Sequence, residues 1–319
     1  MLTQPPDELL KEIQSIIRKT PVLIIGSGHS SAFGLPGMSQ FASHIDSQLS
    51  SCTLSVEESK IWERIRPAVI ENLELGLNHV SQGDPGADSL LERLKKITTD
   101  LFRDASIDAF QWMVTQSVDN PNFALAQLIK RLFEGAPQNQ VAIDVITTNY
   151  DLIIETLCDM INLPVMTGFT GYLRKTFNSS SLNQPKFSRL MVSRNQKVEH
   201  KYTAMRYVRL LKVHGSVNWS LKEGLAIENP IWQPCGQSGV VIPGSFKYKD
   251  SIVESLFDNI RTIANDSMRN CHAIMTYGFG FNDDHIQRVA QERIANGIPA
   301  IIISKTWTPR IKDILESNP

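Results

Sequence analysis

The sequence predicts an α/β protein with a doubly wound parallel sheet. Short apolar runs with β-branched residues recur along the chain, as is typical of strands buried on both faces of a sheet. Each run ends at small or polar residues, and segments with helical spacing separate the runs. The five runs span residues 22–25, 141–146, 207–213, 271–277 and 298–303. Ligands of such sheets bind at the carboxyl ends of the strands, so the residues after each run are the candidates for function.

The first run leads into a loop of small residues, GSGHSSAFGLPG, at positions 26–37. Glycines in such a loop allow a ligand to approach the backbone closely. A strand, a small-residue loop and a helix in this order commonly present backbone N–H groups to a phosphate. The spacing is not the dinucleotide fingerprint, because Ser31 stands where the third glycine is needed. By itself, the loop is equally consistent with a simple strand-to-helix turn.

The other four runs also end in polar or glycine-rich segments. These segments are TTNYD at 147–151, HGSVNW at 214–219, GFGFNDD at 278–284, and Ser304. Taken alone, Asn149 and Asp151 suit an ordinary N-terminal cap of the helix expected over 152–160. Residues 239–243, GVVIP, predict a further short strand.

Helical spacing predicts the connections between these strands. Helices are expected after Asp7 and over residues 39–49, 251–268 and 285–295. Residues 55–135 have helical spacing throughout, which predicts a helical insertion beside the sheet. An apolar stripe within it is typical of a core or a subunit interface: Trp62, Ile65, Leu73, Leu91, Leu94, Phe102, Phe110 and Trp112. The polar segment 167–206 predicts irregular structure with some strand.

Composition disfavours several classes of protein. The 319 residues carry a net charge of -1, with a pI near 6.7. Such a balance disfavours direct binding of nucleic acid or of a membrane surface. The sequence has neither a signal-peptide pattern nor an apolar run long enough to span a membrane, so a cytoplasmic protein is expected. Its four cysteines form no CxxC pair, which disfavours a disulfide framework or a zinc ribbon.

In this order, the motifs GSGHS with GLP, TTNYD, HG and GFGFND resemble those of the Sir2-like, sirtuin-related NAD-binding family. They are most similar to its bacterial branch, whose members hydrolyse NAD in anti-phage defence. The resemblance implies a Rossmann-like Sir2 fold in which residues 1–319 form a single NAD-binding domain with the insertion at 55–135. It also implies that NAD is bound as a substrate.

The resemblance further implies a role for each matching residue. In the first loop, the residues expected to wrap the pyrophosphate and the nicotinamide ribose are Gly26, Ser27, Gly28, Ser30, Gly34 and Pro36. Asn149 would lie by the ribose and the attacking water, Asp151 would contact the nicotinamide, and His214 would be the catalytic histidine. Thr148 belongs to the same motif, where it replaces a glutamine. The residues expected at the adenosine end are Gly278, Gly280, Asn282, Asp283 and Ser304.

Departures from the family pattern narrow the expected activity. Deacylases of this family carry four zinc cysteines between the catalytic histidine and the second glycine loop, whereas this interval contains Cys235 alone, so no zinc is expected. Gly37, Met38 and Ser39 replace the aspartate, phenylalanine and arginine of the deacylase loop. Residues 241–243 resemble a remnant of the acyl-lysine clamp. His29, inside the first loop, replaces an aliphatic residue and has no assigned role.

The leading hypothesis is an NAD glycohydrolase that yields nicotinamide and ADP-ribose as an effector of anti-phage defence. An NAD-dependent deacylase, an ADP-ribosyltransferase and a non-catalytic sensor of NAD or ADP-ribose are the alternatives. Because uncontrolled NAD cleavage would harm the host cell, control is expected from homo-oligomerisation or from a partner such as a HerA-type ATPase or an Argonaute-like protein. The helical insertion is the expected surface for assembly.

Overall fold

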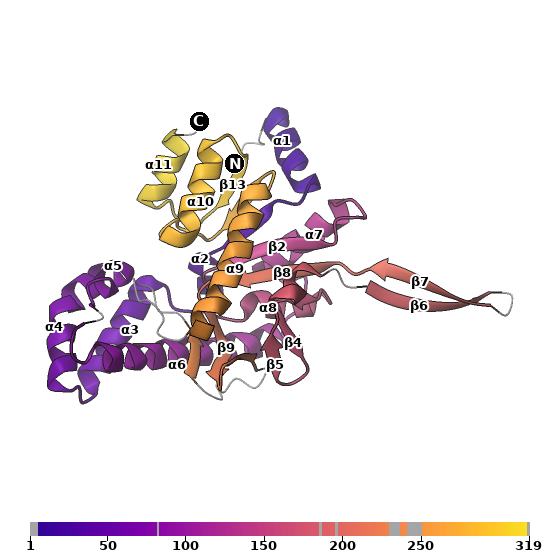
Figure 1. The fold of residues 1–319 in the computed structure, drawn as a ribbon. Helices are drawn as coiled ribbons and strands as arrows, with labels where there is room; N and C mark the ends of the chain where they lie inside the picture. Colours follow the sequence, from indigo (N-terminus) through magenta and orange to yellow (C-terminus); the bar gives the residue numbers. More distant parts are fainter. Residues whose placement is uncertain are drawn as a thin grey trace.

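The computed structural model describes residues 6–81, 83–184, 187–194, 197–229, 237–240 and 251–317 (Figure 1). At its centre is a six-stranded parallel sheet in the order β13-β12-β1-β2-β8-β3. Its strands are β1 (Val22–Ile25), β2 (Ala142–Thr147), β3 (Val165–Met166), β8 (Tyr207–Lys212), β12 (Ile274–Tyr277) and β13 (Ala300–Ile303). The five predicted runs all form strands of this sheet, and the two-residue edge strand β3 joins them. The predicted α/β class with a parallel sheet is therefore confirmed.

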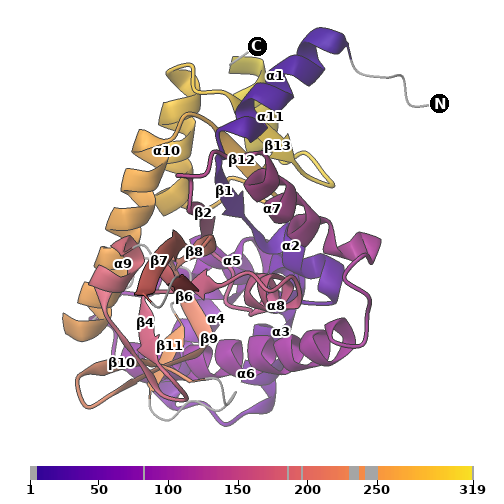
Figure 2. The same cartoon turned by 90° about the vertical axis from the view of Figure 1, so that its right-hand side faces the viewer.

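Helices cover both faces of the sheet, as Figure 2 shows from the side. The strand side chains alternate between two apolar clusters, since Leu23 and Ile25 lie in one while Val22 and Ile24 lie in the other. The first cluster includes side chains of α3 (Met38–Ser51), α4 (Val56–Glu71), α6 (Ala87–Met113), α7 (Ala124–Gly135) and α8 (Ile153–Met160). The second includes side chains of α9 (Ser251–Asn270), α10 (Asp284–Ala295) and α11 (Pro309–Ser317). The sheet is therefore doubly wound.

An N-terminal helix, α1 (Asp7–Arg18), contacts α7.

The segment from 55 to 135 is helical, with α5 (Leu73–Leu77) and the short 3-10 helix η2 (Pro121–Phe123) joining α4, α6 and α7. Figure 1 shows α3, α4, α5 and one end of α6 together as a lobe beside the sheet. Most of the predicted apolar stripe is buried, whereas Phe110 and Trp112 near the end of α6 are 38% and 39% exposed. Whether residues 55–135 form an insertion within a single domain stays a prediction.

A second sheet, which the sequence did not predict, packs beside the first. It is antiparallel, in the order β11-β9-β10-β5-β4. Its strands are β4 (Phe169–Gly171), β5 (Lys175–Phe177), β9 (Gly215–Lys222), β10 (Leu225–Glu228) and β11 (Gln237–Val240). The predicted strand at 239–243 thus overlaps β11, while residues 241–243 lie outside the described part. The 3-10 helix η3 (Ser179–Asn183) follows β5.

The segment expected to be largely irregular contains a long hairpin as well. Strands β6 (Phe187–Arg194) and β7 (Lys197–Ala204) pair with each other in antiparallel register. They form a separate two-stranded sheet that projects from the body of the molecule (Figure 1). Residues 167–206 therefore contain the expected strand structure, but with four strands, β4, β5, β6 and β7, they are less irregular than the sequence predicts.

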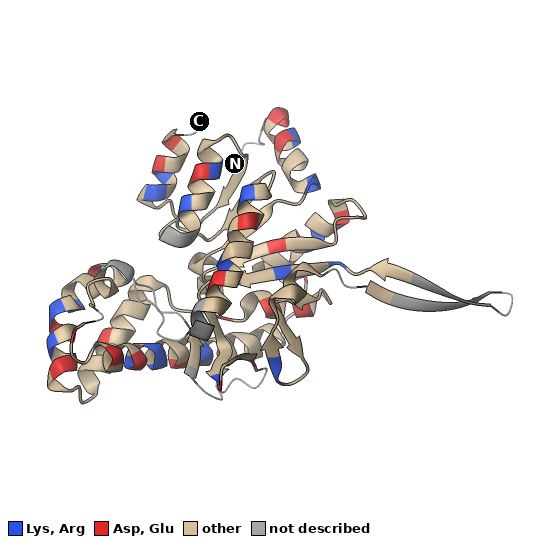
Figure 3. Ribbon diagram, viewed as in Figure 1, with Lys and Arg blue, Asp and Glu red and all other residues tan. Residues whose placement is uncertain are grey.

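Acidic and basic residues occur together on the same helices, as Figure 3 shows for α6, α10 and α11. Within α6, Lys96 pairs with Asp100, and Arg103 pairs with Asp100 and Asp104. The described helices include none that combines the length and the apolar character needed to cross a membrane.

Candidate functional site

The glycine loops after β1 and β12 lie directly against each other. The N–H of Gly28 donates a hydrogen bond of 3.0 Å to the carbonyl oxygen of Gly278. A Cβ atom added to Gly26 would lie 2.5 Å from the same oxygen. Gly278 also has a φ of +61°, which favours glycine. The first loop includes the short helices α2 (Ser27–Ser30) and η1 (Ser31–Phe33), so both predicted ligand loops meet at the carboxyl edge of the sheet.

A buried hydrogen-bonded group joins the first loop to the end of β2. Ser30 Oγ donates to Asp151 Oδ2 at 2.6 Å and accepts from Asn149 Nδ2 at 2.8 Å. Asn149 Nδ2 also donates to the carbonyl oxygen of Gly26 at 3.0 Å. The exposed fractions of Ser30, Asn149 and Asp151 are only 4%, 7% and 3%. Because both hydrogens of the Asn149 amide are engaged, its carbonyl oxygen Oδ1 is the atom that can accept a hydrogen bond from a ligand or water.

Asp151 also caps the helix that follows. Its Oδ1 accepts a hydrogen bond of 3.0 Å from the N–H of Ile153, the first residue of α8. One oxygen of the Asp151 carboxylate thus has the capping role that the sequence suggests, while the other oxygen accepts the hydrogen bond from Ser30. The Asn149 side chain takes no part in the cap and points toward the first loop.

His214 and Asp283 form a second polar pair at this edge. His214 follows β8, and Asp283 precedes α10. His214 Nε2 is hydrogen-bonded to Asp283 Oδ2, and 8% of His214 is exposed. Asp283 Oδ1 accepts a hydrogen bond of 3.1 Å from the N–H of Ile286, which fixes the carboxylate at the start of α10. A carboxylate held in this way orients the imidazole ring.

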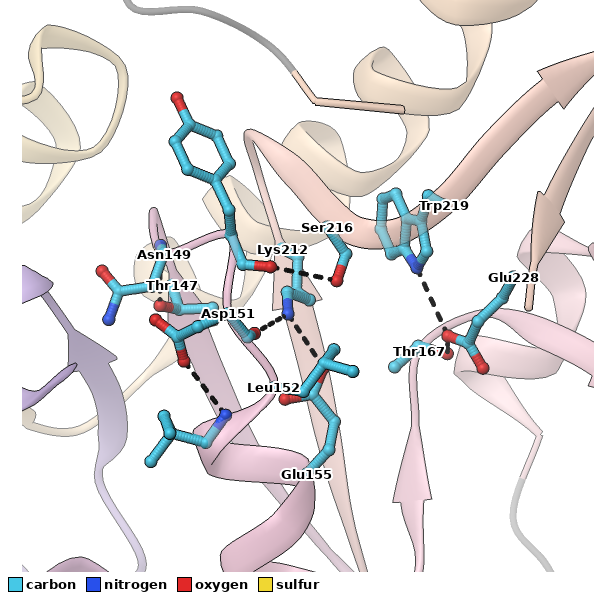
Figure 4. A network of polar contacts seen from close by, with 12 residues as sticks. Thr147, Asn149, Asp151, Leu152, Glu155, Thr167, Lys212, Ser216, Trp219 and Glu228 are labelled. Carbon is cyan, nitrogen blue, oxygen red and sulfur yellow. Dashed lines mark hydrogen bonds and ion pairs between the residues drawn. The ribbon is translucent and has the colours of Figure 1, made fainter. Parts of the chain in front are cut away.

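A buried cation lies beneath the Asn149–Asp151 segment. Lys212, the last residue of β8, is 1% exposed. Its ammonium donates to the carbonyl oxygen of Asp151 and to Glu155 Oε1, the latter at 2.9 Å (Figure 4). Burial raises the pKa of the Glu155 carboxyl, and the charge of Lys212 opposes this shift. Lys212 thus fixes the backbone of the segment that carries Asp151. The sequence pattern did not single out Lys212, which is one of two cations, with Arg209, in the run 207–213.

Other predicted site residues lie at the same edge without joining these two groups. Gly280 and Asn282 belong to the second glycine loop, where Asn282 is exposed. The carbonyl oxygen of Gly280 accepts from Thr308 Oγ1 at 2.9 Å. Ser304 follows β13, and its Oγ donates to the carbonyl oxygen of Thr306 at 2.6 Å.

The other predicted residues of the first loop do not belong to the hydrogen-bonded group of Ser30, Asn149 and Asp151. Ser27 is exposed, and its carbonyl oxygen accepts from Ser31 Oγ at 3.0 Å. Gly34 ends η1 with a φ of +85°, and Pro36 lies between it and α3. Thr148 is partly buried beside Asn149. The structure thus brings Ser30, Asn149 and Asp151 into contact, and places these other residues around them.

The expectation that no zinc is bound can be compared only with the part of the chain that the structure describes. Within that part, no three His, Cys, Asp or Glu side chains are grouped closely enough to hold a metal ion. Cys52, Cys158 and Cys271 are free thiols. Cys235 and the suggested clamp remnant at 241–243 lie outside the described residues.

A comparison with protein families gives one match. Residues 144–301 match the model of the SIR2-like domain. The SIR2-like region covers just under half of the chain. It contains Asn149, Asp151, His214 and the second glycine loop, whereas the first glycine loop and Ser304 lie outside it.

Several solved structures that match the chain are of Sir2 proteins. One is a Sir2 homologue in complex with NAD, with 14% identity and a TM-score of 0.44 over 94% of this chain and 84% of that chain. A mutant Sir2 homologue in complex with 2'-O-acetyl ADP ribose has 14% identity and a TM-score of 0.43 over 95% and 87% of the two chains. A Sir2 enzyme structure has 13% identity and a TM-score of 0.42 over 98% of both. No curated protein sequence matches the chain.

Proposed function

We propose that the protein is an NAD glycohydrolase, which uses water to cleave the bond between nicotinamide and ribose. The observation that carries this proposal is the pair of polar groups at the carboxyl edge of the sheet. One group is Ser30, Asn149 and Asp151, and the other is His214 with Asp283. The SIR2-like match over residues 144–301 supports NAD as the substrate.

These residues can perform the chemistry of glycosidic-bond hydrolysis. The nicotinamide leaves with the electron pair of the C–N bond and becomes neutral, while the ribose carbon develops oxocarbenium character. Asn149 Oδ1 would accept a hydrogen bond from the attacking water, which forms the new C–O bond. His214 would take the proton of that water, a contribution of about 10²- to 10⁴-fold in rate. Asp151 would hold the departing nicotinamide.

We further infer that the enzyme acts as an effector of anti-phage defence by depleting NAD in the cytoplasm. Such an activity requires control by assembly or by a partner. The end of α6 and the segment after it expose Trp112, Val114 and Val118, at 39%, 53% and 39%. This apolar surface supports the proposal that the chain forms a homo-oligomer or binds a regulatory protein, such as a HerA-type ATPase or an Argonaute-like protein.

The test is NAD cleavage by the purified protein, with nicotinamide and ADP-ribose measured by chromatography. Wild type should release both in equal amounts, with or without an acyl-lysine peptide. Asn149→Ala and His214→Ala should lower the rate at least 100-fold. Asn122→Ala and His79→Ala, which change exposed residues of the same types outside the site, should cleave at the wild-type rate.

Other results would support the alternatives. Nicotinamide release that requires the peptide would indicate a deacylase, and ADP-ribose attached to a protein would indicate a transferase. Binding of NAD without cleavage, both alone and in the assembled state, would indicate a sensor and contradict the glycohydrolase.

A further inference from the structure

His29 lies where the two glycine loops meet. It is the third residue of α2 and directly precedes Ser30. Its backbone N–H donates a hydrogen bond of 3.1 Å to the carbonyl oxygen of Gly26. Gly278 packs so closely that an added Cβ would lie 2.4 Å from the backbone nitrogen of His29. The residue is therefore part of the framework of the candidate site.

The imidazole ring of His29 is enclosed by aromatic side chains. Its centroid lies 5.2 Å from that of Phe33 and 5.4 Å from that of Tyr277, and the Tyr277 contact is edge-on. Only 3% of the residue is exposed. An apolar side chain would suit these neighbours better, because polar groups lose hydrogen bonds to water when they are buried.

Neither ring nitrogen of His29 has a hydrogen-bond partner within the described residues. Buried polar atoms are nearly always paired, so each exception requires an explanation, such as strain, a catalytic role or a bound water or ion. Burial lowers the pKa of His29 to about 4, although the negative charge of Asp151 acts in the opposite direction. The ring is therefore neutral near pH 7 and offers one N–H donor and one nitrogen acceptor.

The group that completes this arrangement must both donate and accept hydrogen bonds. A primary carboxamide does so, because its NH2 can reach acceptors while its oxygen accepts from an N–H. The Asp151 carboxylate accepts a hydrogen bond from Ser30, the neighbour of His29, and its charge acts on the His29 ring, so it would favour the NH2 side of such a group. A ligand carboxylate in the same place would be repelled by the negative charge of Asp151.

We propose that His29 is a specificity-determining residue that binds the carboxamide of nicotinamide. This inference rests on the proposed function for the identity of the ligand, but it concerns binding and not cleavage. His29 donates to the carboxamide oxygen and accepts from its NH2, beside Asp151. The site therefore prefers a nicotinamide dinucleotide to its nicotinic acid counterpart.

The test compares His29→Leu and His29→Gln with wild type by calorimetric titration. The ligands are carba-NAD, in which the glycosidic bond resists hydrolysis, and ADP-ribose, which lacks nicotinamide. His29→Leu should weaken carba-NAD binding at least tenfold and change ADP-ribose binding by less than twofold. His29→Gln should recover most of the loss, because its amide also offers a donor and an acceptor. Thermal melting verifies that each variant is folded.

Three results would overturn the inference. Carba-NAD binding to folded His29→Leu could equal that of wild type, or both ligands could weaken by the same factor, which would indicate a structural role. The wild type could also bind neither ligand, and the proposed NAD activity would then fail as well. If His29→Leu selectively loses carba-NAD while the wild type never cleaves NAD, the glycohydrolase fails and the role of His29 stands.

Discussion

Ser30 Oγ donates a hydrogen bond of 2.6 Å to Oδ2 of Asp151, and this bond links the first loop to the end of β2. Ser30→Ala removes this donor from a buried carboxylate, and a hydrogen bond to a charged group contributes about 1.5–3 kcal/mol. We expect kcat for NAD cleavage to fall about 10- to 100-fold. Ser31→Ala, in the same turn but exposed, is the matched control and should retain the wild-type kcat. Equal rates for the two variants would contradict this role of Ser30.

Lys212 is expected to stabilise the fold beneath the site. Lys212→Met leaves the Glu155 carboxylate, whose side chain is 23% exposed, without its cation, and a hydrogen bond to a charged group contributes about 1.5–3 kcal/mol. Urea denaturation should show a loss of this size in the free energy of unfolding. The double variant Lys212→Met, Glu155→Gln should recover part of the loss, because no unpaired carboxylate remains. A single variant as stable as wild type would refute the prediction.

His29 should make stability depend on pH. Its pKa is lowered from 6.5 to about 4 in the folded protein, so below pH 6.5 the unfolded chain binds a proton that the folded chain does not. The contribution to the free energy of unfolding is full above pH 6.5 and falls by about 3 kcal/mol as the pH decreases to 4.

Denaturation of His29→Leu at a series of pH values checks this prediction. The variant should lose less stability than wild type between pH 6.5 and 4. His79→Leu, which removes an exposed imidazole, should follow wild type. Parallel curves for wild type and His29→Leu would show that the proton is not excluded from His29.

Gly278→Ala should separate the two glycine loops. The new methyl group would lie 2.4 Å from the backbone nitrogen of His29, at a position whose φ of +61° disfavours alanine. We expect a melting temperature lower by several degrees and a loss of ADP-ribose binding, measured by thermal melting and calorimetry. Gly135→Ala is the control, since no atom lies within 4 Å of its added Cβ. Equal behaviour of the two variants would contradict a close contact between the loops.

The parallel sheet could be predicted because its strands carry a strong local signal. A strand buried on both faces is apolar along its whole length, as in Val22–Ile25, and its polar end is visible in the sequence. The candidate residues follow from the same pattern, because all parallel strands end at one edge. The pattern places Ser30, Asn149 and Asp151 at this edge, whereas their expected roles came from the resemblance to the Sir2-like family and not from the strand pattern.

The antiparallel sheet could not be predicted in the same way. Strand β9 follows His214 directly, and its buried residues include Ser216 and Ser220 as well as Trp219. Its partners β10 and β11 carry no strong strand signal in the sequence, because the stability of such strands depends on the neighbours with which they pair. The interaction of Lys212 with Glu155 could not be predicted either, because the two residues are 57 positions apart in the sequence and meet only in the folded chain.

The contact between Gly28 and Gly278 also determines when the site can form during protein synthesis. β1 pairs with β12 along one edge, in register from Val22 with Ile274 to Ile25 with Tyr277. A ribosome-bound chain that has not yet released residues 274–283 lacks this neighbouring strand, the second glycine loop and the Asp283 partner of His214. The nascent protein therefore cannot assemble the site until residues 274–283 have left the ribosome. For the proposed NAD glycohydrolase, this order of assembly would keep unfinished chains inactive.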